Sequence, residues 1–568
     1  MGSLVLKIKN NYLLLFLLLL IGWMCLNFIQ SVLTEIHSDE AYYFLYGENL
    51  AWGYFDHPPM VGLMIFISKL FCGGNLSIRL MTILLQLATI TMCWKLVEEQ
   101  FPDSKKILTF FVITGSLVMF QAYGFITTPD SPFLFFIALF LWSYKKFLKQ
   151  ESWINVLLLA VSIAGLIYSK YHAFLVIGLI LLSNLKLLLR YKFWIAGLFA
   201  LALLTPHIYW QVSNDFPSFK YHISDRNNGF DWNCFFEYIP NQMAVFNPFT
   251  FGAVVYLLIK RKASDVFERG MYFLIIGFIS IFWVISTFRY VEPHWTVACS
   301  IPMILLLYRH SLQNDKLFRF VKYAIAPSLL IILIARVVLA FGLLPERLGF
   351  NGKDKQCKEI ESIAGDLPVV FTGSFQKASD YHFFTGKVSL LLSAANTRYT
   401  QFDFLQKELE YQGKPVFVYS SIPGKSKQYK AGDQIIEGYF ADHFQSVNRV
   451  KIDFELPKKV FYPGDTLRVG CEIINPSRVA IDFQHPEFPV TFQVGYSYKS
   501  EKKQFEFFDC ELNEPVHILP AYGKISRVLE TVVPNVASGH YHFFLTLSNP
   551  VCSARNSSFI SMVIKANK

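Results

Sequence analysis

Charge is scarce in this chain of 568 residues. Only 17% of the residues are Asp, Glu, Lys or Arg, whereas 53% are hydrophobic and 17% are aromatic. Such an excess of apolar side chains is not expected of a soluble globular protein and indicates a membrane protein. The net charge of +10 does not point to nucleic acid. Its cations lie in short clusters between apolar runs, as topology determinants do, and not on one basic face.

The sequence also lacks the motifs of metal and redox chemistry. Its nine cysteines include no Cys-x-x-Cys pair, so neither a zinc site nor a thioredoxin-like motif is indicated. If the C-terminal part is extracytoplasmic, two of Cys471, Cys510 and Cys552 can form a disulfide, and free buried thiols are the alternative. No internal repeat or low-complexity tract is present, which excludes a repeat architecture.

Long apolar runs dominate the chain up to about residue 344. The first, near residues 12–33, follows Lys7 and Lys9, and it is too long for a signal peptide, so we expect a retained membrane span. Further spans are expected near 77–97, 107–123, 131–147, 153–168, 171–189, 193–210, 241–260, 270–288, 295–309 and 321–343. This pattern predicts a polytopic α-helical membrane protein with about eleven transmembrane helices.

The loops between these spans are of two chemical kinds. Alternate loops carry clusters of Lys and Arg and are predicted to be cytoplasmic by the positive-inside rule. The others are rich in Asp, His, Tyr, Trp and Pro, and they comprise residues 34–76, 127–130, 169–172, 211–242 and 289–295. We therefore expect a protein of the cytoplasmic (inner) membrane with a cytoplasmic N-terminus. Its polar motifs and, from the odd number of spans, its C-terminal part would be extracytoplasmic.

The chain after residue 344 has two regions with different sequence patterns. Residues 345–447 mix strand-like segments near 368–372 and 415–419 with a helical segment near 400–412, which predicts a small α/β domain. Residues 448–568 alternate short strands with turns, the pattern of an immunoglobulin-like β-sandwich. The predicted domains are thus 1–344, 345–447 and 448–568.

The most informative residues are two adjacent acids, Asp39 and Glu40, placed just after the first span. A carboxylate in a partly dry site beside the membrane can accept a proton from a hydroxyl group, which is what the general base of glycosyl transfer does. A solvated acidic pair at a helix start is the alternative. The short stretches 40–50 and 61–70 are predicted to be interfacial helices that hold the pair at the bilayer surface.

The pair is followed by Tyr42 and Tyr43 and then by the run from Asp56 to Pro59, Asp-His-Pro-Pro. This arrangement resembles the GT-C superfamily of membrane glycosyltransferases. It is most similar to the bacterial branch of the protein O-mannosyltransferase family and to the aminoarabinose transferases that modify lipid A. The resemblance covers roughly residues 30–345 and is most specific over 38–60.

The resemblance implies an inverting transfer of a sugar from a polyprenyl-phosphate carrier to an acceptor outside the membrane. Asp39 matches the catalytic acid, which would act as general base, and Glu40 would orient Asp39 or the substrate. The aminoarabinose transferases have an Arg two residues after the acidic pair, whereas this chain has Ala41 and Tyr42 there. Their way of holding the substrate is therefore not carried over.

A departing lipid phosphate needs positive charge around it. Lys170 and His172, between two apolar spans, and Arg226, in a long outer loop, are the predicted phosphate ligands. The alternatives are a Lys170 side chain that snorkels to the interface and a loop ion pair of Arg226 with Asp225.

Further outer-loop residues are predicted to contact the substrate: Tyr42, Tyr43, Asp56, His57, Asp130, Tyr171, Glu292 and His294. Asp130 is alternatively a helix cap. A metal could be held by Asp39, Glu40, His57 and His294, but nothing in their spacing is metal-specific, and we predict none.

Two other functions fit a chain of this kind. A transporter or flippase of lipid-linked substrates would place charge near mid-membrane, whereas the span at 77–97 shows little polar beyond Gln86 and threonines. A non-catalytic envelope binding protein would leave the acidic and histidine motifs without a role. The sugar stays open, and so does the acceptor, which can be lipid A, another envelope glycolipid or a protein.

Overall fold

The computed structural model describes residues 12–98, 102–224, 232–345, 350–432, 434–498 and 505–566. By its internal contacts the chain divides into two compact units, residues 1–352 and 353–568. The first boundary expected from the sequence, at 344, lies close to this division. The further division at 447 is not resolved by it and stays a prediction.

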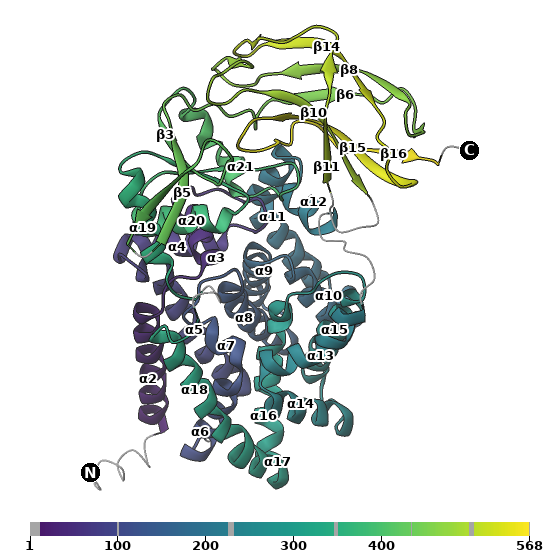
Figure 1. Cartoon of the computed structure of the whole chain (residues 1–568). Coiled ribbons are helices and arrows are strands. Elements are labelled where there is room, and N and C mark those ends of the chain that lie inside the picture. The colour runs from purple at the N-terminus through teal and green to yellow at the C-terminus, as the bar shows by residue number, and fades with distance from the viewer. Residues whose placement is uncertain are drawn as a thin grey trace. The chain divides into compact units, whose positions relative to one another are not determined.

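Unit 1 is entirely helical in its described residues (Figure 1). Its α-helices are α2 (Tyr12–Leu33), α3 (Ser38–Glu48), α4 (Met60–Phe71), α5 (Leu76–Val97), α6 (Ser104–Ser116), α7 (Val118–Ala122), α8 (Asp130–Lys149), α9 (Trp153–Ser169), α10 (Ala173–Ser183), α11 (Tyr191–Ser213), α12 (Pro217–Ser224), α13 (Trp232–Phe246), α14 (Pro248–Lys260), α15 (Val266–Ser286), α16 (Ser300–Gln313), α17 (Asp315–Phe320) and α18 (Ala326–Ala340). Short 3₁₀ or π segments complete it: η1 (Leu185–Leu189), η2 (Pro293–Cys299) and η3 (Val321–Ile325).

Six of these helical stretches are long and apolar enough to cross a membrane, within the residues that the structure describes. They are Tyr12–Leu33, Leu76–Val97, Asp130–Lys149, Tyr191–Ser213, Val266–Ser286 and Asp315–Ala340, and a bent pair, α13 and α14, would make a seventh. Each matches an expected span. The polytopic α-helical class is confirmed, but the expected number of about eleven is not reached by long helices.

The other expected spans are present as shorter or broken helices. The segment at 107–123 is interrupted at Leu117, between α6 and α7, and α10 ends at Asn184 after 11 residues. Between α13 and α14 the chain turns through 107° at Asn247, which has a positive φ and precedes Pro248. At Asn184 and at Asn247–Pro248 a polar or proline residue breaks the helix, and an averaged hydropathy does not register it, so sequence counting gives too many full spans.

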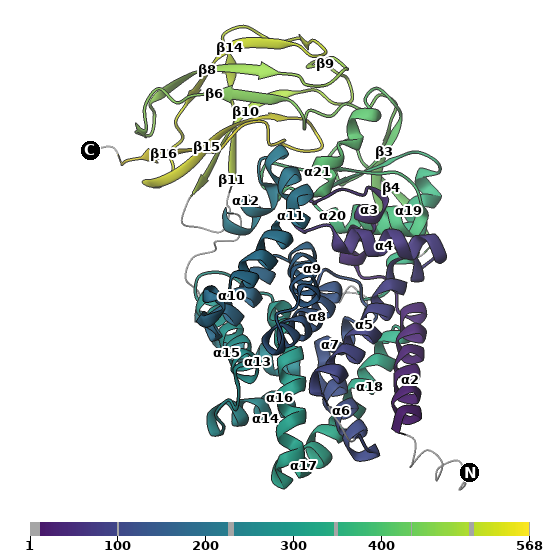
Figure 2. The ribbon, with the colours of Figure 1, turned by 180° about the vertical axis from the view of Figure 1, so that it is seen from behind.

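The helices form a bundle with two distinct ends. Both views place α3, α4 and α12 at one end and α6, α14 and α17 at the other (Figures 1 and 2). A single continuous core runs through the bundle, with contributions from α2 and from most helices between α5 and η3. The loops that lie with α3 and α4 are the Asp-, His- and Tyr-rich ones, so the chemically promising segments share one end of unit 1.

Unit 2 begins with helix α19 (Lys353–Ala364) and a five-stranded mixed sheet. The strands lie in the order β2 (Ser389–Leu392), β1 (Val369–Thr372), β3 (Val416–Tyr419), β5 (Gln434–Ala441) and β4 (Lys427–Ala431). β1 pairs in parallel with β2 and β3, and β5 pairs antiparallel with β3 and β4. Helices α20 (Phe375–Thr385) and α21 (Gln401–Leu405) and the 3₁₀ segment η5 (Lys407–Glu410) connect the strands. This region therefore contains both helices and strands, as expected.

The rest of unit 2 is a two-layered β structure, as the alternating pattern predicts. One sheet has the order β11 (Phe505–Asp509), β10 (Thr491–Tyr498), β15 (Gly539–Ser548), β16 (Ile560–Ile564) and β7 (Val460–Phe461). The other has the order β12 (Glu511–Leu512), β14 (Lys524–Val532), β8 (Thr466–Ile474) and β6 (Lys451–Phe454), and a small pair joins β13 (Ile518–Leu519) and β9 (Ile481–Asp482). Inward-facing apolar residues of both sheets form one core. All nine cysteines are free thiols, so no disulfide is formed.

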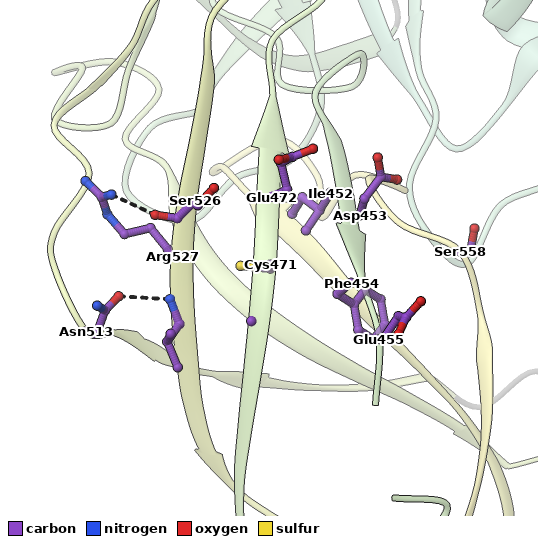
Figure 3. Close-up of a pocket in the computed structure, with 12 residues that line it drawn as sticks. Ile452, Asp453, Phe454, Glu455, Cys471, Glu472, Asn513, Ser526, Arg527 and Ser558 are labelled. Carbon is purple, nitrogen blue, oxygen red and sulfur yellow. Dashed lines mark hydrogen bonds between the residues drawn. The ribbon is translucent and has the colours of Figure 1, made fainter. Parts of the chain in front are cut away.

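A shallow hollow lies on the sheet of β6, β8 and β14, and Figure 3 shows its lining. Acidic side chains, Asp453, Glu455 and Glu472, face Arg527 across it. Arg527 donates to the backbone carbonyl of the adjacent Ser526 at 2.8 Å. None of the residues predicted to carry chemistry lies here.

Candidate active site

The acidic pair lies in the first turn of α3. His37 is the N-cap: its Nδ1 accepts a hydrogen bond from the Asp39 N–H at 3.3 Å, and its own N–H donates to Glu40 Oε2 at 3.0 Å. This reciprocal capping box fixes the start of the helix. The two acidic side chains differ in exposure, because that of Asp39 is 43% exposed whereas that of Glu40 is fully buried.

Glu40 is held by Arg79, which sits near the start of α5. The Arg79 Nε donates to Glu40 Oε1 at 2.8 Å and one terminal nitrogen donates to Oε2 at 2.5 Å. The remaining guanidinium N–H groups donate to the backbone carbonyls of Ser31, Thr34 and Glu35. All guanidinium donors are thus used, in a bidentate geometry that suits arginine.

Glu40 also accepts a hydrogen bond from the backbone N–H of Thr127, at 2.9 Å. Both of its oxygens are therefore occupied, and the side chain ties α3 to α5 and to the turn before α8. The sequence predicts that Glu40 orients either Asp39 or the substrate. Complete burial behind this ion pair favours the first role, in which Glu40 fixes the turn that presents Asp39.

Asp56 and His57 lie in the loop between α3 and α4 and are held by tyrosines of α3. The hydroxyl of Tyr46 donates to the Asp56 carboxylate, and Tyr43 Oη is 3.3 Å from His57 Nε2. The His222 Nε2 of α12 lies 3.1 Å from the Asp56 carbonyl oxygen. The two prolines after His57 restrict this loop further, as the sequence predicts.

His57 is a neutral imidazole at physiological pH. Burial lowers its pKa to about 4, and the charge of Asp56, which raises the pKa, offsets this only in part. The positive charges of His222 and Lys170 lower the pKa as well. His57 therefore offers a hydrogen bond rather than a positive charge.

Asp130 and Lys170 form a buried ion pair. The Lys170 ammonium lies 2.7 and 2.8 Å from the two oxygens of Asp130, and both side chains are almost fully buried. Asp130 occupies the first turn of α8, whose N-cap is Pro129, so the cap interpretation does not describe it. His294 Nε2 lies 3.9 Å from the second Asp130 oxygen. Together with His294, the pair brings together three segments that are far apart in sequence.

His172 is enclosed by aromatic rings at the start of α10. Its ring centroid is 5.2 Å from that of Phe282 and 5.3 Å from that of Trp295. Burial lowers its pKa well below the usual value, and the charge of Lys170 lowers it further, so His172 is neutral near pH 7. Its buried Nδ1 has no hydrogen-bond partner among the described residues. A polar atom left in this state is suited to a ligand.

Tyr171 belongs to a second polar network beside these residues. Its hydroxyl lies 3.2 Å from His207 Nε2 and accepts a hydrogen bond from Gln211 at 2.7 Å. Gln211 also donates to Ser218, whose hydroxyl donates to the backbone carbonyl of Tyr54. The network connects the turn between α9 and α10, helix α11 and helix α12 to the loop that carries His57.

These groups converge around Tyr43. Burial raises its pKa well above the usual value, and the negative charges of Asp39, Asp56 and Asp130 raise it further because all three lie near its hydroxyl. Tyr42 packs beside it, with ring centroids 5.9 Å apart. The structure thus gathers most of the predicted outer-loop residues into one region of unit 1.

Other predicted residues lie at the edge of this region or outside the described part. Glu292 directly precedes η2, and the His294 ring makes an edge contact with Tyr123 at 6.3 Å. Arg226 lies outside the described residues. Arg289 donates to the His222 carbonyl oxygen at 3.1 Å.

Sequence analysis missed Arg79 and His222. Arg79 falls inside the expected span at 77–97, so the statement that this span holds little beyond Gln86 and threonines was wrong. An arginine inside an apolar run was the feature that could have revealed it, because a buried charge there needs a partner. His222 lies four residues before Arg226 and carries no distinctive motif.

Within the described ranges no group of three or more His, Cys, Asp or Glu side chains is arranged to hold a metal ion. Glu40, one of the residues considered for such a site, is fully engaged by Arg79 and backbone N–H groups. The absence of a metal requirement nevertheless stays a prediction.

Comparison with known proteins identifies the fold. Residues 56–210 match the family model described as dolichyl-phosphate-mannose-protein mannosyltransferase. The crystal structure of ArnT from Cupriavidus metallidurans bound to undecaprenyl phosphate superposes with a TM-score of 0.55 at 14% identity, covering 76% of this chain and 98% of that one. The apo structure of the same protein gives 0.54 at 13% identity, covering 75% and 97%. The chain therefore has the fold of ArnT.

One curated protein is similar to this chain in sequence. Lipid A galacturonosyltransferase RgtD of Rhizobium johnstonii is 25% identical over 287 residues, which are 48% of this chain. The match spans 60% of that relative's length. The resemblance expected from Asp39, Glu40 and the Asp-His-Pro-Pro run is confirmed at the level of the fold, which is that of ArnT.

Proposed function

We propose that the chain is an inverting glycosyltransferase that moves a sugar from a polyprenyl-phosphate carrier to an extracytoplasmic acceptor. The observation that carries the proposal is the contrast between Asp39 and Glu40. Glu40 is locked into a buried ion pair, and this leaves Asp39 as the accessible carboxylate, held in place by the capping box. A rigidly placed, partly exposed carboxylate meets the geometric requirement for a general base.

The proposed reaction transfers one proton and exchanges one glycosidic bond for another. Asp39 accepts the proton of an acceptor hydroxyl as its oxygen attacks the anomeric carbon of the donor sugar. The bond between that carbon and the carrier phosphate breaks, and polyprenyl phosphate leaves with the bonding electrons. Attack from the face opposite the phosphate inverts the anomeric centre.

The leaving phosphate needs cations and hydrogen-bond donors. Lys170, His172 and Arg226 are the proposed phosphate ligands. Lys170 already donates to both oxygens of Asp130, so it would act as part of that pair. The neutral His172 would donate a hydrogen bond through its otherwise unpartnered Nδ1. The proposed contacts of the sugar or the acceptor are Tyr42, Tyr43, Asp56, His57, Asp130, Tyr171, Glu292 and His294.

The donor class is supported by one structural neighbour. ArnT, which shares the fold, was crystallised with undecaprenyl phosphate. The proposed acceptor is lipid A or another envelope glycolipid, because RgtD acts on lipid A, and a protein is the alternative. The proposed location is the inner membrane, with Asp39 and unit 2 on the extracytoplasmic side, as the distribution of Lys and Arg among the loops suggests.

Transport remains the second candidate function, because two charges do lie inside apolar helices. Arg79 and Arg336 are both almost fully buried. Each, however, is bound by protein groups, and Arg336 donates to Asn27 at 2.7 Å and Gln121 at 2.8 Å. Side chains engaged in this way hold helices together, whereas a transport pathway would need them to contact its substrate.

The test compares envelope lipids and glycoproteins, by mass spectrometry, from cells that contain the intact chain and cells that lack it. Glycosyl transfer predicts a sugar adduct that disappears from one lipid or protein while its polyprenyl-phosphate donor accumulates. Redistribution of an unchanged lipid-linked sugar across the membrane would instead establish transport.

A further inference from the structure

A second polar cavity lies in unit 1, away from Asp39. Its volume is about 1050 Å³, and it is formed where the C-terminal ends of α5, α8 and α16 meet the N-terminal ends of α6 and α15. Helix α8 links the two regions, because Asp130 in its first turn belongs to the candidate active site and Lys149 in its last turn lines the cavity. Its 20 residues span about 30 Å, the thickness of a bilayer core.

The cavity has the chemistry of an amphiphile site. Its lining includes six cationic side chains and only three acidic ones, which are Glu98, Asp265 and Glu268. The cations are Lys106, Lys145, Lys149, Lys186, Arg190 and Arg309. Its remaining wall is largely apolar, with Met271, Leu305 and Leu306 among the lining residues. The cations suit the phosphate of a lipid head group, and the apolar wall suits the hydrocarbon chain joined to it.

The cations are not all neutralised by the protein. Glu98 is shared between Lys145 at 3.2 Å and Lys149 at 2.7 Å, and Arg309 lies 3.1 Å from Asp265. Lys186 forms no ion pair with any residue in the described part of the chain. Both partners of the Lys149–Glu98 pair and of the Arg309–Asp265 pair are 42–60% exposed, so these two pairs are weak and an incoming anion can compete for them. Arg309 also lies 3.5 Å from the buried Glu268, and Arg190 pairs with Glu151 at 2.7 Å.

We propose that this cavity binds the head group of an anionic phospholipid from the leaflet on the Lys- and Arg-rich side of the membrane. That leaflet is the cytoplasmic one if the orientation under the proposed function holds. Basic pockets between membrane helices on this side are suited to anionic head groups. The lipid would bridge α5, α8, α15 and α16, whose ends converge at the cavity, and stabilise the bundle from the side opposite Asp39.

The test measures lipid binding to the full-length protein in detergent. After delipidation, phosphatidylglycerol, phosphatidylcholine or inorganic phosphate is titrated, and binding is followed by native mass spectrometry and by the shift in Tm. The variant Lys149→Gln/Lys186→Gln removes two cavity cations. The matched control Lys260→Gln/Lys262→Gln removes two exposed cations of another Lys- and Arg-rich loop that do not line the cavity.

We expect one phosphatidylglycerol per chain, a loss of about tenfold or more in affinity in the cavity variant, and no change in the control. Phosphatidylcholine should bind weakly, and millimolar phosphate should not displace the lipid. Equal losses in both variants, equal binding of both lipids or displacement by inorganic phosphate would overturn the proposal. The measurement does not involve sugar transfer. The lipid proposal can therefore fail while the glycosyltransferase assignment stands, and the glycosyltransferase assignment can fail while the lipid proposal stands.

Discussion

The guanidinium of Arg79 binds both oxygens of the Glu40 carboxylate, and neither side chain is exposed to solvent. The adjacent Asp39 is 43% exposed. Two acids that are neighbours in the sequence therefore have opposite environments, and their roles separate accordingly. Glu40 supports the fold of the site, and Asp39 is the group proposed to do chemistry.

Removing Arg79 should destabilise unit 1 strongly. Arg79→Met leaves the Glu40 carboxylate buried without its partner, which costs about 3–5 kcal/mol for pairs of this kind. We expect a clear fall in Tm in detergent. Lys69→Met is the control, because Lys69 pairs with Glu48 at 2.9 Å while both side chains are partly exposed, so about 1 kcal/mol or less is expected. Similar losses in the two variants would contradict the anchoring role.

Variants of the Asp130–Lys170 pair should distinguish its contribution to stability from its contribution to sugar transfer. Asp130→Asn and Lys170→Met should each be destabilising, and combining them should recover most of the lost stability, since no buried charge is then left unpaired. If Lys170 assists the leaving phosphate, the recovered double variant still transfers no sugar. Normal transfer by a folded double variant would show that the pair is only structural.

The histidine in the Asp-His-Pro-Pro run predicts a pH dependence of stability. The pKa of His57 falls from 6.5 to about 4 on folding. Because the unfolded chain binds the proton more readily, the free energy of unfolding decreases as the pH falls from about 6.5 to about 4, by up to about 3 kcal/mol. His57→Gln should flatten this part of the Tm profile. Parallel profiles for the wild type and the variant would contradict a lowered pKa of His57 in the folded protein.

Gly124 marks a close approach behind the turn that binds Glu40. A Cβ at this position would lie 1.7 Å from Gln86 Oε1, whereas one at Gly178 would meet nothing within 4 Å. Gly124→Ala should therefore cost about 1–3 kcal/mol, and Gly178→Ala, inside α10, should be neutral or slightly stabilising. Thermal unfolding of the two variants compares them directly, and an unchanged Tm for Gly124→Ala would be inconsistent with this packing.

The sequence predicted the membrane class and the β-rich C-terminal region. These depend on composition, on runs of apolar residues and on period-two alternation, which are local properties. It did not predict the partner of Glu40, because Arg79 is 39 residues away and meets it only through the packing of α3 against α5. The protonation states of His57 and His172 also depend on burial created by distant helices.

Span counting failed for a different reason. α10 stops after 11 residues and α13 turns sharply into α14, although the sequence predicts one span over 171–189 and another over 241–260. Asn184 and the Asn247–Pro248 step are single residues or pairs whose effect depends on local backbone geometry. A hydropathy average over a whole span does not register them.

The measurement that tests the central claim most directly is sugar transfer by Asp39→Asn, compared with binding of undecaprenyl phosphate to the same protein. The substitution removes the proton acceptor at nearly constant size. We predict that the transferred sugar disappears from envelope lipids and glycoproteins while Tm and undecaprenyl phosphate binding stay at wild-type values. Wild-type transfer by Asp39→Asn would contradict the assignment of Asp39 as the general base.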